Sequence, residues 1–159
     1  MTLPVGAAAP DFALRDQHGA PVSLGALRGS PVVLVFFPFA FSGVCTGELQ
    51  VLREQEPVLR AAGARLLAVS CDPVFALRRF ADEEGLEFPL LSDFWPHGEV
   101  SRSFGVLVEE QGCPARSSYV LDGTGVVRWG VHNPMGEARD AGEYVAQVTA
   151  LAGTDRSAK

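Results

Sequence analysis

Cys45 is the residue of this sequence whose type and position best suit chemistry. It lies between an apolar, largely β-branched run over residues 32–37 and a helix-like stretch that starts beside it. At the start of a helix, backbone N–H groups point outward and the helix dipole favours negative charge. A thiol placed there ionises more readily than usual, and the thiolate is the nucleophilic form. The sequence therefore predicts a reactive cysteine where a buried strand gives way to a helix.

Two further residues stand at fixed offsets before this thiol. Pro38 and Ser42 complete the pattern P-x-x-x-S-x-x-C. Because proline makes up only about 5% of residues, both offsets are matched by accident for about one cysteine in a hundred. The plain alternatives are that Ser42 caps the helix with its hydroxyl and that Cys45 is an inert buried residue. The position at a strand-to-helix junction favours an active-site pocket over these two alternatives.

The pattern resembles the active-site loop of the peroxiredoxin family, which reads P-x-x-x-[TS]-x-x-C at the same place. The similarity covers most of the chain, including the segments PDFALRDQHG and PLLSDFWPHG and Arg116 ahead of SSYVLDGTG. Within the family, the segments FFPFAFSGVC and LLSDFWPHG are most similar to the one-cysteine alkyl hydroperoxide reductase E group. The resemblance implies a thiol-dependent peroxidase that acts on hydrogen peroxide, organic hydroperoxides and peroxynitrite.

Peroxide reduction by a thiol sets clear chemical demands. A thiolate must attack one oxygen in line with the O–O bond and expel hydroxide or alkoxide, and donors must face the oxygen on which charge develops. The resemblance makes Cys45 the nucleophile and Arg116 the guanidinium that holds both the thiolate and the peroxide oxygens. The product is a sulfenic acid on Cys45. A surface arginine is the plain alternative for Arg116.

Three residues are expected to support this pair. Ser42 offers a hydroxyl that can donate to the peroxide while its lone pairs accept elsewhere. Pro38 walls the pocket and adds no competing N–H. Glu48, one turn after the cysteine, can orient Arg116 through a charge-assisted pair. The alternative for Glu48 is an ordinary first-turn carboxylate favoured by the helix dipole.

No cysteine stands where two-cysteine peroxiredoxins carry the thiol that resolves the sulfenic acid. One subgroup has it five residues after the nucleophile, where this chain has Gln50, and another has it near the C-terminus, where no cysteine follows Cys113. The sequence therefore predicts a one-cysteine enzyme recycled by an external thiol. Cys71, which ends a strand-like run, and Cys113, in a loop shortly before Arg116, are the internal candidates. For both, a passive thiol is the favoured alternative.

The expected partners follow from the resemblance and from composition. Arginine is abundant and Lys159 is the single lysine, which indicates a GC-rich genome. For an actinobacterial source, mycothiol with a mycoredoxin is the expected reductant, and thioredoxin is the alternative. The resemblance also implies a homodimer packed through loops near Phe41 and Trp95, with an apolar rim that suits alkyl hydroperoxides. The alternative for these aromatic residues is a place in the core.

Composition excludes several other function classes. The net charge of −6, without a basic stripe, argues against nucleic-acid binding. No apolar run is long enough to span a membrane, and the pattern of the first residues is not the one expected of a signal peptide. Three cysteines without a CxxC pair predict a reduced, cytoplasmic protein. The three histidines share no ligand spacing with the cysteines, and no phosphate-binding loop is present, so neither a metal nor a cofactor is expected.

The elements that must position Cys45 form a single α/β domain over residues 1–152, followed by a flexible tail over residues 153–159. Apolar patterns predict an N-terminal hairpin, a sheet that is parallel at its centre and a closing antiparallel hairpin through the turn DGTG. This order matches a thioredoxin-like fold, a central mixed sheet flanked by helices. The predicted strands cover residues 12–14, 22–24, 31–37, 65–70, 88–91, 117–121 and 126–131, and the predicted helices cover 46–62, 74–84, 96–104 and 144–151.

Two other functions compete with the peroxidase. A thioredoxin-like monothiol oxidoreductase is one, because Ser42 to Cys45 occupies the place of a CxxC motif whose first cysteine is missing. A non-enzymatic redox sensor or holdase that signals through oxidised Cys45 is the other. Pro38 and Arg116 count against the first, since a disulfide substrate needs an open thiol. Catalytic turnover of hydroperoxide separates the peroxidase from both.

Overall fold

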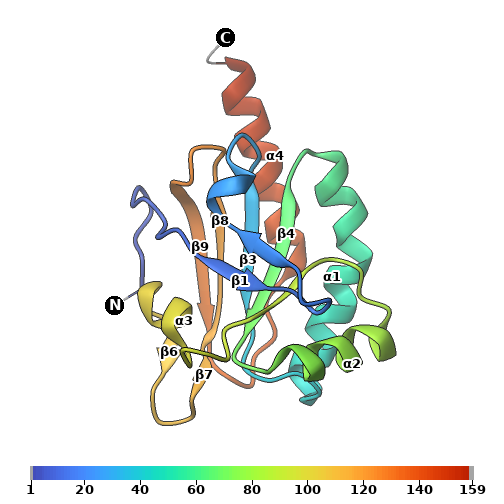
Figure 1. Cartoon of the computed structure of the whole chain (residues 1–159). Helices are drawn as coiled ribbons and strands as arrows, with labels where there is room; N and C mark the ends of the chain where they lie inside the picture. Colours follow the sequence, from blue (N-terminus) through green and yellow to red (C-terminus); the bar gives the residue numbers. More distant parts are fainter. Residues whose placement is uncertain (1, 158–159) are drawn as a thin grey trace.

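The computed structural model describes the backbone of residues 2–157 and contains a mixed sheet of seven strands at its centre (Figure 1). The strands follow the order β2-β1-β5-β4-β3-β8-β9. The strands are β1 (Ala13–Arg15), β2 (Pro21–Ser23), β3 (Val32–Phe36), β4 (Arg65–Ser70), β5 (Leu90–Ser92), β6 (Leu107–Val108), β7 (Cys113–Pro114), β8 (Arg116–Leu121) and β9 (Val127–Asn133). The helices are η1 (Gly25–Leu27), α1 (Gly43–Ala61), α2 (Val74–Glu84), α3 (Glu99–Ser103) and α4 (Ala141–Ser157).

The direction of the strands confirms the predicted thioredoxin-like arrangement. β3, β4 and β5 run parallel at the centre, whereas β8 and β9 are antiparallel. The β1–β2 hairpin joins the other edge through an antiparallel contact with β5. Because β3 and β4 are parallel, their carboxyl ends meet at one edge of the sheet, and residues that follow these two strands come together there.

The core has two layers, one on each face of the sheet. Val33 and Val35 of β3 pack with residues of α1, α2 and α4. Leu34 and Phe36 face the other way and pack with α3 and the N-terminal segment. Alternate residues of a strand point to opposite faces, so a strand covered on both sides must be apolar throughout. This explains the unbroken apolar run before Cys45.

Several boundaries differ from those that the sequence predicts. α1 begins at Gly43 instead of residue 46, so Cys45 lies inside its first turn. Pro57 lies inside this helix, where a proline normally kinks or ends a helix, yet α1 continues to Ala61. Leu52 and Leu59, on either side of the proline, are both buried in the same core, and tertiary packing of this kind stabilises a helix beyond its local propensity.

Other differences concern short or terminal elements. The loop around Cys113 contains β7, which pairs with β6. α4 begins earlier than predicted and is helical up to Ser157, so it includes part of the tail predicted over residues 153–159. Residues 158–159 lie outside the described residues, and the flexibility of the tail stays a prediction.

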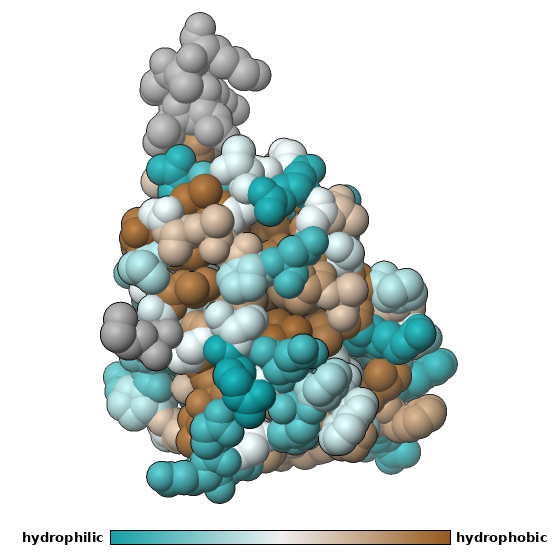
Figure 2. Space-filling model, turned by 60° about the vertical axis from the view of Figure 1, so that its left-hand side comes forward, coloured by the Kyte–Doolittle hydropathy of each residue, from teal (hydrophilic) through white to brown (hydrophobic). Residues whose placement is uncertain are grey.

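The surface is chemically mixed. Figure 2 shows one face on which hydrophobic patches lie between hydrophilic ones, without a continuous apolar band. Within the described part of the chain, no helix is both long and apolar enough to cross a bilayer.

Candidate active site

The loop that leads to Cys45 is anchored to the end of β4. Phe37 N donates to Val69 O at 2.9 Å, and Ala40 N donates to Asp72 Oδ2 at 2.9 Å. Pro38, between these two anchors, is buried. Both bonds join the segment after β3 to the segment around the end of β4, as the parallel pairing of the two strands requires. The loop is therefore held in place before α1 begins.

Phe41 gives this loop an unusual backbone. It is the one non-glycine residue with positive φ, at 71°, among the described residues. Bulky residues rarely adopt this conformation, which costs on the order of 1–3 kcal/mol and persists only where the surroundings enforce it. The ring is about half exposed and packs edge-on against Phe80 with 5.1 Å between ring centroids. The strained turn directs the chain into α1 with Cys45 facing inward.

Ser42 takes the N-cap position of α1 without capping it through its side chain. Its hydroxyl donates to Phe39 O at 2.9 Å, while its carbonyl accepts the first helical bond from Thr46 N at 2.9 Å. The simple capping role considered for Ser42 is therefore wrong for its hydroxyl. Because its proton is donated to Phe39 O, the hydroxyl does not have it free for a peroxide, and the expected role of Ser42 as a donor is wrong for this arrangement. The hydroxyl oxygen keeps lone pairs free to accept a hydrogen bond.

Arg116, the first residue of β8, contacts the Cys45 thiol. Its Nη1 lies 3.5 Å from Cys45 Sγ, and it also donates to Glu48 Oε1. Nε and Nη2 donate to Met135 O at 2.9 and 2.7 Å. Arg116 is 2% exposed and Cys45 is fully buried, so the surface-arginine alternative is wrong. Each guanidinium nitrogen has a partner, which fixes the direction of Nη1 towards sulfur.

Glu48 joins this arginine to a second one, Arg139, which precedes α4. Arg139 N and Nε donate to Glu48 Oε2 at 2.7 and 2.9 Å, and Nη2 donates to Oε1 at 2.9 Å. Burial opposes the charge of Glu48, but the hydrogen bonds and charges of the two arginines outweigh it and lower the pKa of the carboxyl. Glu48 is thus a buried bridge between two cations, and the alternative of an ordinary exposed first-turn carboxylate is wrong.

Arg139 is anchored on its other side as well. Its Nη1 donates to Phe36 O at 2.6 Å, to Ser117 O at 2.8 Å and to Ser118 Oγ at 2.9 Å. These contacts join the ends of β3 and β8 to the helix that carries Cys45. The sequence analysis missed Arg139, because its neighbours in the segment GEARDAGE are polar and typical of an exposed loop.

The buried side chains of Arg116, Arg139 and Glu48 together carry a net positive charge beside Cys45. Arg116 and Arg139 carry two positive charges against one negative charge on Glu48, and all three side chains are buried. A buried unpaired charge is costly, so an anion beside Arg116 relieves an imbalance. Burial lowers the pKa of the Arg116 guanidinium. Its hydrogen bond to Cys45 and the charges of Glu48 and Cys45 together outweigh this effect, so the pKa is raised. The buried side chains around Sγ thus leave an excess of positive charge beside it.

The other two cysteines lie near this region and form no disulfide. All three cysteines are free and buried. Burial and the charge of Asp93 raise the pKa of Cys71 to about 12. Burial, followed by the charge of Cys45, raises the pKa of Cys113. Both thiols are therefore protonated at neutral pH, a poor state for a nucleophile. Among the described residues, no group of His, Cys, Asp and Glu is arranged to hold a metal ion.

Comparison with known proteins places this site in a family. Residues 5–130 match the model of the AhpC/TSA family. The chain is 44% identical to alkyl hydroperoxide reductase E of Mycobacterium tuberculosis over 150 residues, which cover 94% of this chain and 98% of the relative. It is 36% identical to peroxiredoxin Q of Oryza sativa, over 92% of this chain and 67% of the relative.

Solved structures agree with the sequence relatives. AhpC of Enterococcus faecalis superposes with a TM-score of 0.90 at 28% identity, covering 100% of this chain and 98% of the other. Peroxidoxin BcpB of Mycobacterium tuberculosis superposes with a TM-score of 0.81 at 30% identity, covering 92% of this chain and 97% of the other. The matches extend over the sheet, α1 and the segment that carries Arg116. The chain therefore belongs to the AhpC/TSA family and is a peroxiredoxin, a thiol-dependent peroxidase.

Proposed function

We propose that this chain reduces hydrogen peroxide and organic hydroperoxides through Cys45. The observation that carries the proposal is the 3.5 Å contact between Arg116 Nη1 and Cys45 Sγ in a buried cluster with one excess positive charge. The thiolate attacks one peroxide oxygen, an S–O bond forms, and the O–O bond breaks. The other oxygen leaves as hydroxide or alkoxide and takes up a proton. Cys45 becomes a sulfenic acid.

The neighbouring residues divide the remaining tasks. Arg116 stabilises the thiolate and the oxygen on which charge develops. Ser42 accepts a hydrogen bond from the hydroperoxide, since its own proton is donated to Phe39 O. Pro38 closes the pocket without adding an N–H. Glu48 and Arg139 are positioning residues that act through Arg116.

Recycling needs an external thiol in this proposal. A thiol attacks the sulfenic acid sulfur, releases water and leaves a mixed disulfide, and a second thiol then frees Cys45. Mycothiol with a mycoredoxin and thioredoxin are the candidate reductants. The similarity to alkyl hydroperoxide reductase E supports the one-cysteine type. Resolution by Cys113 or Cys71 is the disfavoured alternative, because both thiols are protonated at neutral pH.

The substrate and the assembly state are proposed from exposed apolar side chains. Phe39 and Phe41, beside the cysteine loop, are 42% and 48% exposed. They offer an apolar rim to the alkyl part of an organic hydroperoxide.

Phe75, Phe94 and Trp95 are exposed as well. We assign these aromatic residues to a homodimer interface, which sedimentation of the protein at micromolar concentration tests.

Burial of the thiol argues against the thioredoxin-like alternative. Cys45 has no exposed surface. A small peroxide can reach such a sulfur after a minor opening, but the in-line approach of a protein disulfide needs far more room. The sensor alternative predicts oxidation without turnover and therefore differs in kinetics.

Stopped-flow oxidation of the reduced protein by hydrogen peroxide and by cumene hydroperoxide tests the proposal. The expected result is second-order oxidation much faster than that of free cysteine, with sulfenic acid on Cys45 by mass spectrometry. Cys45→Ser should lose the reaction, whereas Cys71→Ser should keep it as the matched control. A rate equal to that of free cysteine, or an active Cys45→Ser variant, would refute the proposal.

A further inference from the structure

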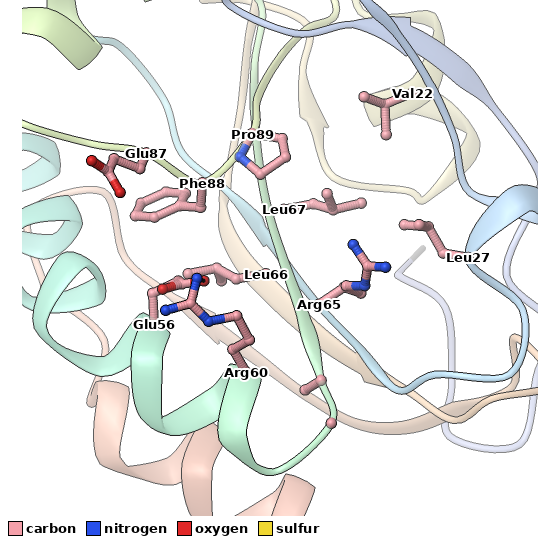
Figure 3. A pocket seen from close by; sticks show the side chains of 12 residues that line it. Val22, Leu27, Glu56, Arg60, Arg65, Leu66, Leu67, Glu87, Phe88 and Pro89 are labelled. Carbon is pink, nitrogen blue, oxygen red and sulfur yellow. Dashed lines mark ion pairs between the residues drawn. The ribbon is translucent and has the colours of Figure 1, made fainter.

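A groove lies beside the first residues of β4, which β5 does not pair with. This is the end of the sheet opposite Cys45. Its volume is about 630 Å³, within the range of pockets that bind small ligands or peptide side chains. The lining comes from β2, η1, the end of α1, the start of β4 and the segment that leads into β5 (Figure 3). Its apolar side chains are those of Val22, Leu27, Leu66, Leu67, Phe88 and Pro89.

The groove exists because the ladder between β4 and β5 stops at a proline. The first rung of this ladder is formed by Ala68 N, which donates to Pro89 O at 3.1 Å. The next rung towards the amino end of β4 needs an N–H from residue 89 that donates to Leu66 O. Proline has no N–H, so the pairing ends there.

Leu66 is therefore left with backbone groups that face the groove. Arg65 N donates to Pro31 O, on the β3 side of the strand. Successive residues of a strand direct their N–H and C=O groups to opposite edges, so those of Leu66 point away from β3. Unpaired strand groups of this kind are a template for an added strand.

A buried glutamine keeps the groove open. Gln17 is 2% exposed, and its Nε2 donates to Phe88 O at 3.0 Å while its Oε1 accepts from Leu90 N at 2.8 Å. Since Pro89 O faces β4, these groups of Phe88 and Leu90 face the opposite edge, where Gln17 fixes the segment before β5. The groove is thus formed without a ligand, which lowers the entropic cost of binding.

The charges at the groove favour a ligand that carries a carboxylate. Arg60 is paired with Glu56 at 3.7 Å. Arg65 has no ion pair within the part of the chain that the structure describes. Figure 3 shows its side chain on the side of β4 that carries Leu67, whereas Glu87 lies on the other side of the strand. Of the two carboxylates that line the groove, Glu56 is paired with Arg60, and Glu87 is separated from the Arg65 guanidinium by the strand.

We propose that the groove binds a short extended peptide that adds to β4 and directs a carboxylate to Arg65. One residue of this peptide exchanges main-chain hydrogen bonds with Leu66. Its neighbours then alternate between the two sides of the strand, towards Leu66 and Phe88 on one side and Leu67 on the other. Both sides are apolar, so both sets of peptide side chains are buried. Cys45 follows the opposite ends of the strands and takes no part.

Fluorescence anisotropy with a labelled pentapeptide, Val-Thr-Val-Leu-Val with a free C-terminal carboxylate, tests the proposal. Saturable binding is expected. Amidation of the carboxylate and Arg65→Gln should each weaken it by about fivefold, the upper range for an exposed ion pair. Both changes together should weaken it no further than either alone, because they remove the same contact. Arg78→Gln, an exposed arginine of α2, is the matched control and should bind as the unaltered protein does.

Hydrogen exchange reports the main-chain contact separately. The Leu66 amide should exchange quickly in the free protein and become protected with the peptide bound. A peptide N-methylated at each amide should not bind. Absence of saturable binding, equal affinity of Arg65→Gln and the unaltered protein, or binding of octanoate but not of the peptide would overturn the proposal. Unchanged peroxide reduction by Arg65→Gln shows that the variant is folded.

Discussion

Three hydrogen bonds join Glu48 to Arg139, although the two residues are 91 positions apart in the sequence. Through the same carboxylate, Arg139 is connected to Arg116, which contacts the thiol of Cys45. Two residues, Glu48 and Arg116, therefore lie between Arg139 and the sulfur of Cys45. In the proposed mechanism Arg139 contributes a positive charge and helps to position the guanidinium of Arg116.

Replacing Arg139 with Gln should slow oxidation of Cys45 by up to about a hundredfold, because small displacements of a positioning group are costly. Loss of one cation near the sulfur should also move the pH profile of the reaction to higher pH. Arg139→Lys keeps the positive charge but loses the hydrogen bonds of the guanidinium. Its pH profile should therefore be closer to that of the unaltered protein than its rate is. Stopped-flow rates across pH measure both effects.

The control for this prediction is Arg79→Gln. The side chain of Arg79 is 74% exposed and is paired with Glu83 on the surface of α2. Its removal should leave the rate and its pH profile unchanged. An Arg139→Gln variant that is folded and has the unaltered profile would contradict the role of the Arg139 charge.

Replacing Ser42 with Ala should reduce the peroxidase rate by about tenfold or more while stability barely changes. Loss of a helix N-cap hydrogen bond normally costs about 1 kcal/mol, but the Ser42 hydroxyl makes no such bond. The hydrogen bond that it does make, to Phe39 O, is exposed to solvent, so water can replace the hydroxyl there. Ser42→Thr keeps the hydroxyl and should retain activity. Peroxide kinetics and urea unfolding of the same variants separate the two effects. A Ser42→Ala variant that loses stability but not activity would show that the hydroxyl is structural.

Oxidation of the protein by one equivalent of peroxide should consume one thiol and produce no intramolecular disulfide. Cys71 and Cys113 are buried, and burial is the main reason that their pKa values are raised. Cys71→Ala and Cys113→Ala should therefore keep full turnover with an external thiol. Thiol titration and peptide mapping by mass spectrometry measure the outcome. A disulfide between Cys45 and either cysteine would replace the one-cysteine mechanism with an internal one.

Stability should fall in acid partly through Asp122, in the turn between β8 and β9. Burial opposes its charge, but hydrogen bonds from Thr124 and Arg128 outweigh this and lower the pKa of the carboxyl to about 2. Because the folded pKa lies below the ordinary value of 3.8, the contribution is complete above about pH 4 and is lost as the pH falls towards 2. Unfolding of Asp122→Asn should show a shallower pH dependence in this window. Equal slopes for both proteins would exclude Asp122 as a source of acid sensitivity.

Local sequence patterns account for much of the fold. The bounds of β4 and α2 coincide with the predicted ones, because an apolar run and a helical spacing mark them without help from distant residues. The start of α1 was predicted too late, since Gly43 and Val44 have weak helix propensity and only the fold places them in the helix. The β6–β7 pair was missed because two-residue strands carry no periodic signal.

The sequence by itself determined the local elements around Cys45, where we propose the reactive centre. The features around Cys45 are a buried strand, Pro38, Ser42 and a helix start. They are neighbours in the sequence, so they can be recognised without knowledge of the fold. The family resemblance pointed to Arg116 and Glu48, but only the tertiary structure shows how these charges are brought to the sulfur and that Arg139 joins them. The antiparallel placement of β8 beside β3 brings Arg116 to the thiol, and the entry into α4 brings Arg139 to Glu48. Such contacts depend on how the strands are ordered in the sheet, which no spacing along the chain encodes.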